Sequence, residues 1–397
     1  MRLALLCGSL QPGRDGVGDY CRKLGSELSR LGHQILLISL NERYLRSPDQ
    51  EMAEGFSVLR CGLYDSLCRR LELARRALDQ FCPDWVSLQY VCYGYHPKGL
   101  AWGWNPIFAE LGKMGTRRHL MLHELWSGEG GHPPLRHRLL GLGQRWSILD
   151  LYRRFRPDVV TTTMRLYQRR LARRRMVAEV VPLFGNIRTA SVDNERIARI
   201  LCKAGSRLAQ NPRPEFVNGV FFGTIHPDFD AVPLIKWLQE LRTHTRKPVL
   251  LTMIGRSGAA AGGLARQIIK AYLDAVEVIA LGEQSEEIIS QALQFAEFGI
   301  NTGSPAFLGK SGTFAAMQEH GLPVVLADGQ LDAACVGEDV PPVVQFSTPN
   351  SVTRILSSPR LINPTSKAPQ TAENLIHLFE NAEGARSLEI EFNLLKT

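Results

Sequence analysis

The spacing of apolar residues along the chain predicts two successive series of buried strands and amphipathic helices. In the first series, short apolar runs with few charges are typical of strands that are covered on both faces. Apolar residues at intervals of three and four predict helices between them. The predicted strands are 2–7, 33–40, 56–60, 84–91, 120–123, 159–163 and 179–183, and the predicted helices are 19–31 and 67–81. This alternation predicts a Rossmann-like α/β domain.

A second series of the same kind follows a polar stretch. Its predicted strands are 219–222, 248–254, 276–280, 298–301 and 323–326, and its helices are 233–243, 264–273 and one that starts at Ser285. At 397 residues the chain is too long for one ordinary core. We therefore expect an N-terminal domain (1–188), a linker (189–214) with a hinge at 211–214, a C-terminal domain (215–369) and a helical segment (370–397) that packs back toward the N-terminal domain.

The most distinctive motif of the second series is a glycine-rich turn that includes Gly309 and Gly312, followed by a short helix that ends at Gly321. The first turn of a helix leaves backbone N–H groups unpaired, and the helix dipole favours an anion there. Lys310 would add a positive charge, and Ser311 and Thr313 would add hydroxyl donors. The turn therefore predicts a site for a phosphate or diphosphate.

The same turn has an alternative interpretation. Ser311 or Thr313 can simply cap the helix in an ordinary loop. The turn is not a Walker P-loop, because that motif needs a glycine where this chain has Ser304. The motif alone leaves both interpretations open.

Loops that follow strands in the first series supply further candidates. In open α/β sheets the ligand binds beyond the carboxyl ends of the strands, where the loops at Gly16, Tyr93, His123 and Thr163 begin. His123 is a candidate general acid or base, although a lone histidine is more often structural. Gly16 and Gly18 are not followed by the third glycine of the dinucleotide-binding fingerprint, which argues against an NAD-binding site.

Composition and charge narrow the classes of function. The hydrophobic content of 44% is typical of globular domains, and no apolar run reaches the length of a bilayer span. The eight cysteines form no Cys-x-x-Cys pair, which is typical of reduced thiols in a cytoplasmic protein without a metal site.

The net charge of +8 is concentrated in clusters, above all in Arg165–Arg175. Arg165, Arg169 and Arg173 would share one face of a helix, widened by Arg170 and Arg174. We expect this face to contact an anionic membrane, while a solvated helix is the alternative. Nucleic acid is a weaker candidate because Tyr167 is the one interleaved aromatic residue.

The motifs in their order resemble the GT-B-fold glycosyltransferases, most closely the family 4 nucleotide-sugar enzymes, over nearly the whole chain. The matching segments are Gly16-Val17-Gly18-Asp19-Tyr20, Leu31-Gly32-His33, His123-Glu124-Leu125-Trp126, 182–187, Phe222-Gly223, Met253-Ile254-Gly255, Leu281-Gly282 and Gly321-Leu322-Pro323-Val324-Val325. The resemblance implies two Rossmann-like domains that face each other across a cleft.

The resemblance also implies an activity and its residues. The N-terminal domain would bind a glycan, lipid-linked or small-molecule acceptor, and the C-terminal domain a nucleotide-diphosphate sugar. His123 would contact the donor sugar as the catalytic residue, with no metal or cofactor and with retention of configuration. The donor-binding residues would be Gly16, Gly18, Gly255, Arg256, Glu283, Gln284, Gly309, Lys310, Ser311, Gly312, Thr313 and Glu319.

The donor site departs from the family pattern. The place of the usual Arg and Lys reads Thr224-Ile225-His226, and the places of two usual glutamates hold Leu308 and Ala316. Lys310 and Glu319 are candidate substitutes for the lost groups. The Lys-Ser-Gly-Thr sequence is also similar to inverting GT-B enzymes of lipid A and peptidoglycan synthesis, so the stereochemistry stays open. A non-catalytic GT-B binding protein and a sugar-nucleotide epimerase are the alternative functions.

Overall fold

The chain divides into two compact units. The computed structural model describes residues 1–53, 55–128, 134–210, 215–226, 229–256, 258–271, 275–331, 341–358 and 366–394. Unit 1 comprises Met1–Pro182 together with Ala368–Thr397, and unit 2 comprises Leu183–Lys367. None of the helices described is both long and apolar enough to cross a bilayer.

The boundaries between the units lie after Pro182 and after Lys367, whereas the sequence predicted boundaries after residues 188, 214 and 369. Within the predicted linker, α6 (Asn194–Lys203) buries Ile197 and Leu201 in a core of unit 2. Residues 194–203 are therefore a helix of unit 2, because the side chains of Ile197 and Leu201 pack on an apolar surface of that unit. The predicted hinge at 211–214 lies outside the described residues.

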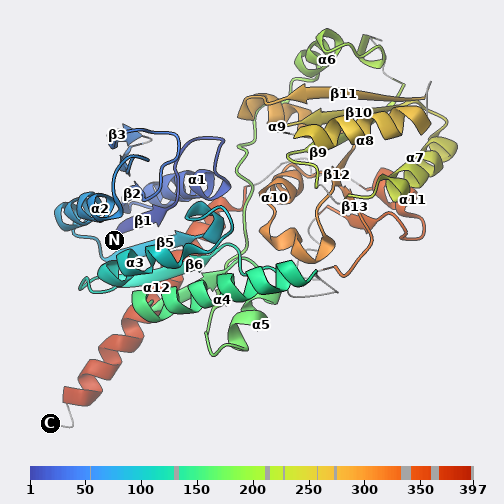
Figure 1. The fold of residues 1–397 in the computed structure, drawn as a ribbon. Coiled ribbons are helices and arrows are strands. Elements are labelled where there is room, and N and C mark those ends of the chain that lie inside the picture. The colour runs from blue at the N-terminus through green and yellow to red at the C-terminus, as the bar shows by residue number, and fades with distance from the viewer. Residues whose placement is uncertain are drawn as a thin grey trace. The chain divides into compact units, whose positions relative to one another are not determined.

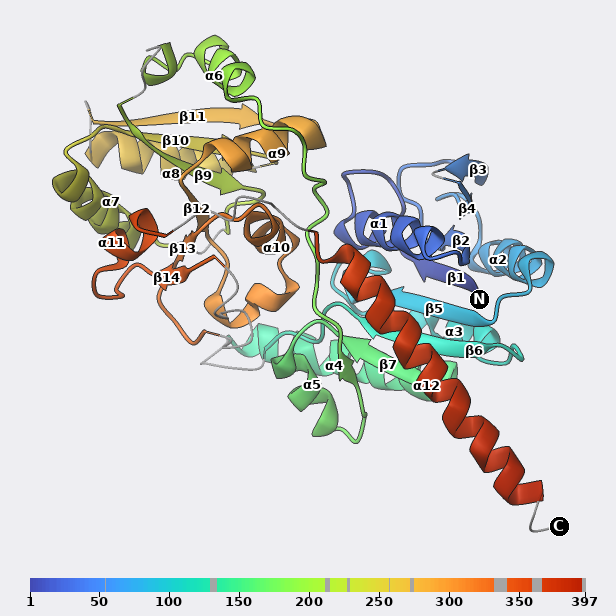
Figure 2. The ribbon, with the colours of Figure 1, turned by 180° about the vertical axis from the view of Figure 1, so that it is seen from behind.

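Unit 1 is built on an eight-stranded sheet with the order β3-β4-β2-β1-β5-β6-β7-β8 (Figures 1 and 2). Neighbouring strands are parallel except for β3 and β4, which form an antiparallel edge. The strands are β1 (Arg2–Cys7), β2 (Gln34–Ser39), β3 (Asp49–Ala53), β4 (Phe56–Arg60), β5 (Trp85–Tyr90), β6 (Arg117–Leu122), β7 (Val159–Thr162) and β8 (Glu179–Val180).

Helices cover both faces of this sheet. On one face Phe379 of α12 (Ala368–Leu394) stacks on Trp85 of β5 at a ring distance of 4.1 Å, and α12 runs beside α1 (Gly16–Arg30). On the other face Tyr90 meets Phe108 of α3 (Asn105–Leu111), which packs against α4 (Leu135–Phe155). The remaining helices of unit 1 are α2 (Leu67–Phe81) and α5 (Arg165–Ala172). The last helix therefore completes the first sheet.

Unit 2 is built on a six-stranded parallel sheet with the order β11-β10-β9-β12-β13-β14. Alternate strand residues feed two cores, one with α7, α8 and α11 and one with α6, α9 and α10. The strands are β9 (Val217–Phe222), β10 (Val249–Ile254), β11 (Val276–Gly282), β12 (Phe298–Asn301), β13 (Val324–Leu326) and β14 (Val343–Gln345). The helices are α7 (Ala231–Thr245), α8 (Gly258–Ala271), α9 (Glu286–Phe295), α10 (Gly312–Glu319) and α11 (Ser351–Leu356).

Candidate functional site

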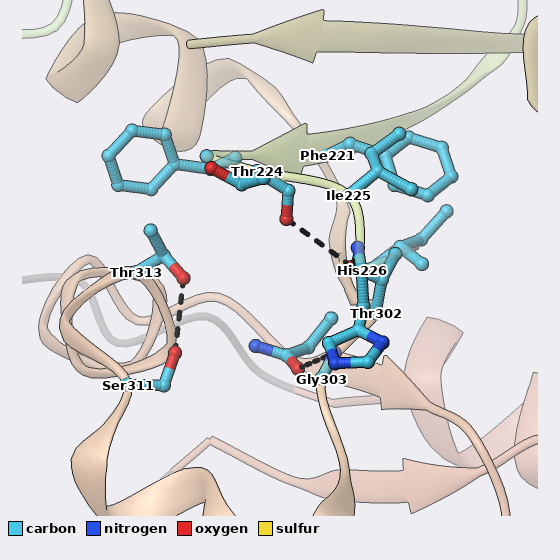
Figure 3. A pocket seen from close by; sticks show the side chains of 12 residues that line it. Phe221, Thr224, Ile225, His226, Thr302, Gly303, Ser311 and Thr313 are labelled. Carbon is cyan, nitrogen blue, oxygen red and sulfur yellow. Dashed lines mark hydrogen bonds between the residues drawn. The ribbon is translucent and has the colours of Figure 1, made fainter. Parts of the chain in front are cut away.

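A pocket of about 180 Å³ lies at the carboxyl ends of β9 and β12 in unit 2 (Figure 3). The loop after β9 forms one wall, the loop after β12 a second, and the start of α10 a third. The lining residues are Phe221, Phe222, Gly223, Thr224, Ile225, His226, Ile300, Asn301, Thr302, Gly303, Ser311 and Thr313. This is the edge of a parallel sheet where ligands of α/β proteins bind.

Glycines lie at or directly after the ends of three neighbouring strands on this edge. Gly223, Gly255 and Gly282 all have positive φ angles, of 93°, 109° and 67°. The backbone N–H of Gly223 donates to Ile254, and that of Gly255 donates to Gly282. A β-carbon on Gly255 would lie 3.1 Å from the Cα of Gly223, so the strand ends pack backbone against backbone.

The start of α10 presents hydroxyl groups to the pocket. Ser311 is the N-cap residue, and its Oγ accepts from the N–H of Phe314 at 3.2 Å. The same Oγ lies 3.1 Å from Oγ1 of Thr313, and Figure 3 shows the two side chains turned toward each other. Both interpretations of the turn are thus compatible with the geometry: Ser311 caps the helix, and it also lines the pocket.

The flanks of the turn differ in their surroundings. Gly309 and Lys310 belong to a short 3₁₀ segment (Pro305–Lys310), and Gly312 is the first residue of α10. The Lys310 ammonium lies 5.5 Å from the ring centroid of Phe307. Lys310 is absent from the pocket lining, although it directly precedes the lining residue Ser311 in the chain.

The loops after β9 and β12 are joined to each other by hydrogen bonds. Oγ1 of Thr302 accepts from the N–H of His226 at 3.0 Å and lies 3.5 Å from the carbonyl oxygen of Thr224. Oδ1 of Asn301 accepts from the N–H of Gly303 at 2.9 Å. The Thr302 hydroxyl therefore links the two walls of the pocket.

Sequence reasoning missed the pocket residues Asn301, Thr302 and His226. The signal was present, because polar residues directly follow a strand that is buried along its length. Where the resemblance implies an Arg and a Lys, the chain has Thr224 and His226 in the pocket wall, with the buried Ile225 between them.

Four predicted donor residues lie on the same sheet edge outside the pocket. Gly255 directly follows β10, and Arg256 forms an ion pair with Glu283 at 3.1 Å. Nε2 of Gln284 donates to the carbonyl oxygen of Leu281 at 2.7 Å. The structure therefore gathers these residues at the ends of β10 and β11, next to the strand whose loop lines the pocket.

Glu319 does not lie in the pocket. It is 3% exposed, and its Oε1 accepts from the backbone N–H groups of Gly185 at 2.8 Å and Lys367 at 3.1 Å. Both partners lie beside the points where the chain enters and leaves unit 2. The carboxylate that we expected to bind the donor instead holds these two segments.

The two positions at which the resemblance implies glutamates hold apolar residues in the core. Leu308 is 2% exposed and Ala316 is fully buried. A β-carbon on Gly185 would lie 2.6 Å from the Cα of Ala316, so the segment after β8 packs closely on α10. The place where the family has its second glutamate is thus occupied by packed backbone.

Gly16 and Gly18 form the first turn of α1 in unit 1. The Asp15 carboxylate caps this turn and accepts from the N–H groups of Val17 and Gly18. A β-carbon on Gly18 would lie 2.2 Å from the carbonyl oxygen of Ser9, so only glycine allows this close approach. Asp15 already occupies the two N–H groups that an anion would use.

His123 is packed into unit 1. It follows β6 and is 5% exposed, Nε2 lies 2.9 Å from Oε1 of Gln89, and Tyr20 meets its ring edge-to-face at 4.8 Å. Burial lowers the pKa of His123 to about 3, so the imidazole is neutral. This environment favours the structural alternative for the residue.

A buried polar chain extends from His123 across the sheet. Nε2 of Gln89 donates to Oγ of Ser87, which lies 2.7 Å from Nδ1 of His119. Nε2 of His119 lies 2.8 Å from Oγ1 of Thr161 on β7. Burial lowers the pKa of His119 to about 3, with a smaller contribution from His123. Both imidazoles are thus members of a hydrogen-bonded core.

No cluster of three His, Cys, Asp or Glu side chains within the described ranges is arranged to hold a metal ion. The polar side chains that line the pocket are four hydroxyls, the Asn301 amide and the His226 imidazole, and they lie beside the apolar Phe221, Phe222, Ile225 and Ile300. Hydroxyl and backbone N–H groups at a helix start are hydrogen-bond donors suited to phosphate oxygens.

Comparison by sequence finds no matching family model and no matching curated protein. Comparison of structures finds HepE from Anabaena in complex with UDP and glucose, with a TM-score of 0.55, 15% identity, and coverage of 98% of this chain and 100% of that chain. The catalytic domain of starch synthase IV from Arabidopsis thaliana, bound to ADP and acarbose, gives a TM-score of 0.54, 13% identity, and coverage of 96% and 99%.

A third similar structure is an α,α-trehalose-phosphate synthase (UDP-forming) from Burkholderia vietnamiensis. It gives a TM-score of 0.53, 12% identity and coverage of 98% of each chain. All three match nearly the whole length of this chain, and their descriptions name bound UDP, bound ADP and a UDP-forming synthase, respectively. The expected fold class is confirmed: the chain has two parallel-sheet α/β domains of the GT-B glycosyltransferase type.

Proposed function

We propose that the chain is a glycosyltransferase that uses a nucleotide-diphosphate sugar, of the family 4 kind and acting with retention and without a metal. The observation that carries this proposal is the pocket at the carboxyl ends of β9 and β12, which the start of α10 closes with Ser311 and Thr313. This pocket lies in the second domain of a chain with the GT-B fold. Structures of that fold have been described with UDP, with UDP-glucose and with ADP.

In the proposed mode of binding, the pocket holds the diphosphate. The hydroxyls of Ser311 and Thr313 and the first N–H groups of α10 donate to its oxygens, and the helix dipole favours its negative charge. Lys310 directly precedes the pocket residue Ser311, and its charge balances that of the leaving diphosphate. The loops that start at Gly255 and Gly282 then hold the nucleoside.

His123 has no acid–base role in this proposal. A general acid or base must come within hydrogen-bonding distance of the reacting group, and this imidazole is already bonded to Gln89 beneath Tyr20. We propose that His123 positions the strand end of β6 beside a site for a glycan, lipid-linked or small-molecule acceptor. We therefore expect replacement of His123 to affect the stability of unit 1 more than the rate of the chemical step.

One observation favours a second candidate, a protein that binds nucleotide sugars without transferring the sugar. The glutamate positions hold the buried Leu308 and Ala316, and the usual pair of cations is replaced by Thr224 and His226. Such a protein would keep the pocket and lack the groups that stabilise the transition state.

Product analysis separates the candidates. The chain is incubated with radiolabelled UDP-, ADP- and GDP-sugars, and free nucleoside diphosphate, free sugar and epimerised sugar are measured. Release of nucleoside diphosphate that Thr313→Val abolishes supports a transferase, with Thr243→Val on the exposed face of α7 as the control. Binding by calorimetry without any release identifies a binding protein, and an epimer identifies an epimerase.

A further inference from the structure

A stripe of exposed apolar side chains runs along the N-terminal half of α4. Leu135, Leu139, Leu142 and Trp146 are 68%, 60%, 49% and 55% exposed. They are spaced by four, three and four residues and therefore span an arc of about 60° on the helix. We call these four residues the α4 stripe. Isolated exposed leucines are ordinary, but four aligned on one helix form a continuous apolar surface.

The α4 stripe faces away from the side of the helix that unit 1 buries. The buried residues of α4 are Gly141, Gln144, Ser147, Ile148, Leu151 and Phe155, which lie on the opposite side of the helix. A surface helix normally carries polar residues opposite its buried face. On α4 that face is apolar instead, which is the pattern of a helix that contacts something besides its own domain.

A second tryptophan extends the stripe sideways. Trp102, in the short 3₁₀ helix Ala101–Trp104, is 46% exposed and meets Trp146 edge-to-face at 6.0 Å. A β-carbon on Gly143 would lie 3.5 Å from the Trp102 ring, so this helix turn lies directly beside α4. Paired indole rings on an apolar patch are typical of surfaces at a membrane–water interface.

Most of the charges beside the stripe are basic. Residues 135–149 contain Arg136, Arg138 and Arg145 and no Asp or Glu, and the next residue, Asp150, is paired with Arg154. Arg136 and Arg138 are exposed and lie on the two flanks of the stripe. This basic pattern suits an anionic surface. A second copy of the chain would instead place arginines against arginines, which costs free energy.

The cluster Arg165–Arg175 belongs to the same region of unit 1. The Tyr167 hydroxyl of α5 bonds to the backbone of Leu125, and Gly128, three residues on, packs against the backbone of His137 in α4. Contrary to our expectation, Arg170 does not widen the exposed face, since it is 7% exposed and lies over the Tyr167 ring. Arg165, Arg169, Arg173, Arg174 and Arg175 are exposed.

We propose that unit 1 binds the surface of an anionic lipid bilayer by inserting the α4 stripe and Trp102 into the headgroup region. The exposed arginines of α4 and α5 contact the anionic headgroups, each adding to the attraction. This inference goes beyond the proposed function and does not depend on it, because lipid binding is measured without any donor or acceptor.

The test uses the full chain in flotation assays with vesicles. We expect binding to mixtures of phosphatidylcholine and phosphatidylglycerol, weaker binding to phosphatidylcholine alone, and weakening with salt. Leu139→Ser with Trp146→Ser should lower the partition coefficient by about tenfold or more. Arg136→Ser with Arg138→Ser should lower it by about ten- to thirtyfold on anionic vesicles.

Matched controls use other exposed residues of unit 1. Met52→Ser with Tyr64→Ser removes side chains that are 70% and 72% exposed, and Arg69→Ser with Arg76→Ser removes two arginines from α2. Both controls should bind vesicles like the wild type, and equal urea midpoints show that the variants are folded.

Two results would overturn the proposal. One is the absence of binding to anionic vesicles, or binding that survives the stripe variant. The other is self-association that depends on the stripe and is unaffected by vesicles in sedimentation experiments. Quenching of tryptophan fluorescence by brominated lipids, lost with Trp102→Phe and Trp146→Phe together, would instead show insertion directly.

Discussion

Gly223 and Thr313 approach each other so closely that a β-carbon on Gly223 would lie 2.6 Å from Cγ2 of Thr313. This approach brings the end of β9 against the start of α10 and sets the width of the pocket. Gly223 also has a φ angle of 93°, which other residues adopt only with strain.

We expect Gly223→Ala to destabilise unit 2 by about 1–3 kcal/mol and to weaken nucleotide binding. Thr313→Ser removes Cγ2, so the double variant should recover the steric part of the loss in a double-mutant cycle. Gly205→Ala is the control, because Gly205 has a φ of 98° with no atom near its missing side chain. Unfolding in urea and calorimetry with UDP and ADP measure both effects. Equal behaviour of the two alanine variants would show that the contact is unimportant.

Lys310 provides a direct test of the diphosphate site. Lys310→Ala should weaken binding of a nucleoside diphosphate by about 1.5–3 kcal/mol, the scale of a charge-assisted hydrogen bond. Lys236→Ala, on the exposed side of α7, should leave the affinity unchanged. Calorimetry with UDP and ADP decides, and an unaltered dissociation constant in the Lys310 variant would remove this residue from the site.

Glu319 should act on stability and not on the ligand. Glu319→Gln weakens the acceptor for the N–H groups of Gly185 and Lys367, which should cost about 1–3 kcal/mol of unfolding free energy. Glu240→Gln on exposed α7 is the control. A fall in nucleotide affinity at unchanged stability would restore the donor-binding role that the sequence predicted.

The buried imidazoles predict an acid limit to stability. The pKa of His119 and of His123 is about 3 in the folded chain against 6.5 for an unperturbed histidine. Between pH 3 and pH 6.5 the unfolded chain binds protons that the folded chain does not. Stability therefore falls as the pH falls from about 6.5 toward 3, and these two histidines do not change it above about pH 6.5. The loss at pH 5 should be roughly 2 kcal/mol for each histidine.

Urea unfolding across this pH range measures that loss. Five of the six tryptophans lie in residues 1–182, so fluorescence reports mainly on unit 1. His123→Gln should reduce the pH slope by about one proton, whereas His244→Gln on exposed α7 should not change it. An identical slope in both variants would mean that His123 is protonated in the folded chain.

The strands were predictable because burial on both faces leaves a run of apolar residues that few other structures tolerate. Arg2–Cys7 and Phe298–Asn301 have the predicted bounds. Helix α4 could not be predicted from its periodicity, since it is apolar on the buried face and again along the α4 stripe. Helix α6 was hidden in a polar stretch, where only Ile197 and Leu201 indicate a buried face.

The site was predictable in part for a related reason. A glycine-rich turn before a helix constrains its own backbone, so Ser311 and Thr313 lie where the sequence placed them, at the start of α10. Glu319 and His123 depend on partners far along the chain, Gly185 for one and Gln89 for the other. Local spacing contains no information about such partners, and both side chains are buried against them.

The return of α12 to unit 1 has a consequence for the order in which the chain folds during synthesis. Trp85 stacks on Phe379, and Arg117 donates to the carbonyl oxygen of Ala382, so both residues lack these partners until α12 is synthesised. Residues 183–367 are synthesised in the interval. Unit 2 is contiguous and can close its two cores first. We therefore expect the earlier-made sheet to keep an open apolar face until α12 emerges, which favours chaperone binding at this sheet during synthesis.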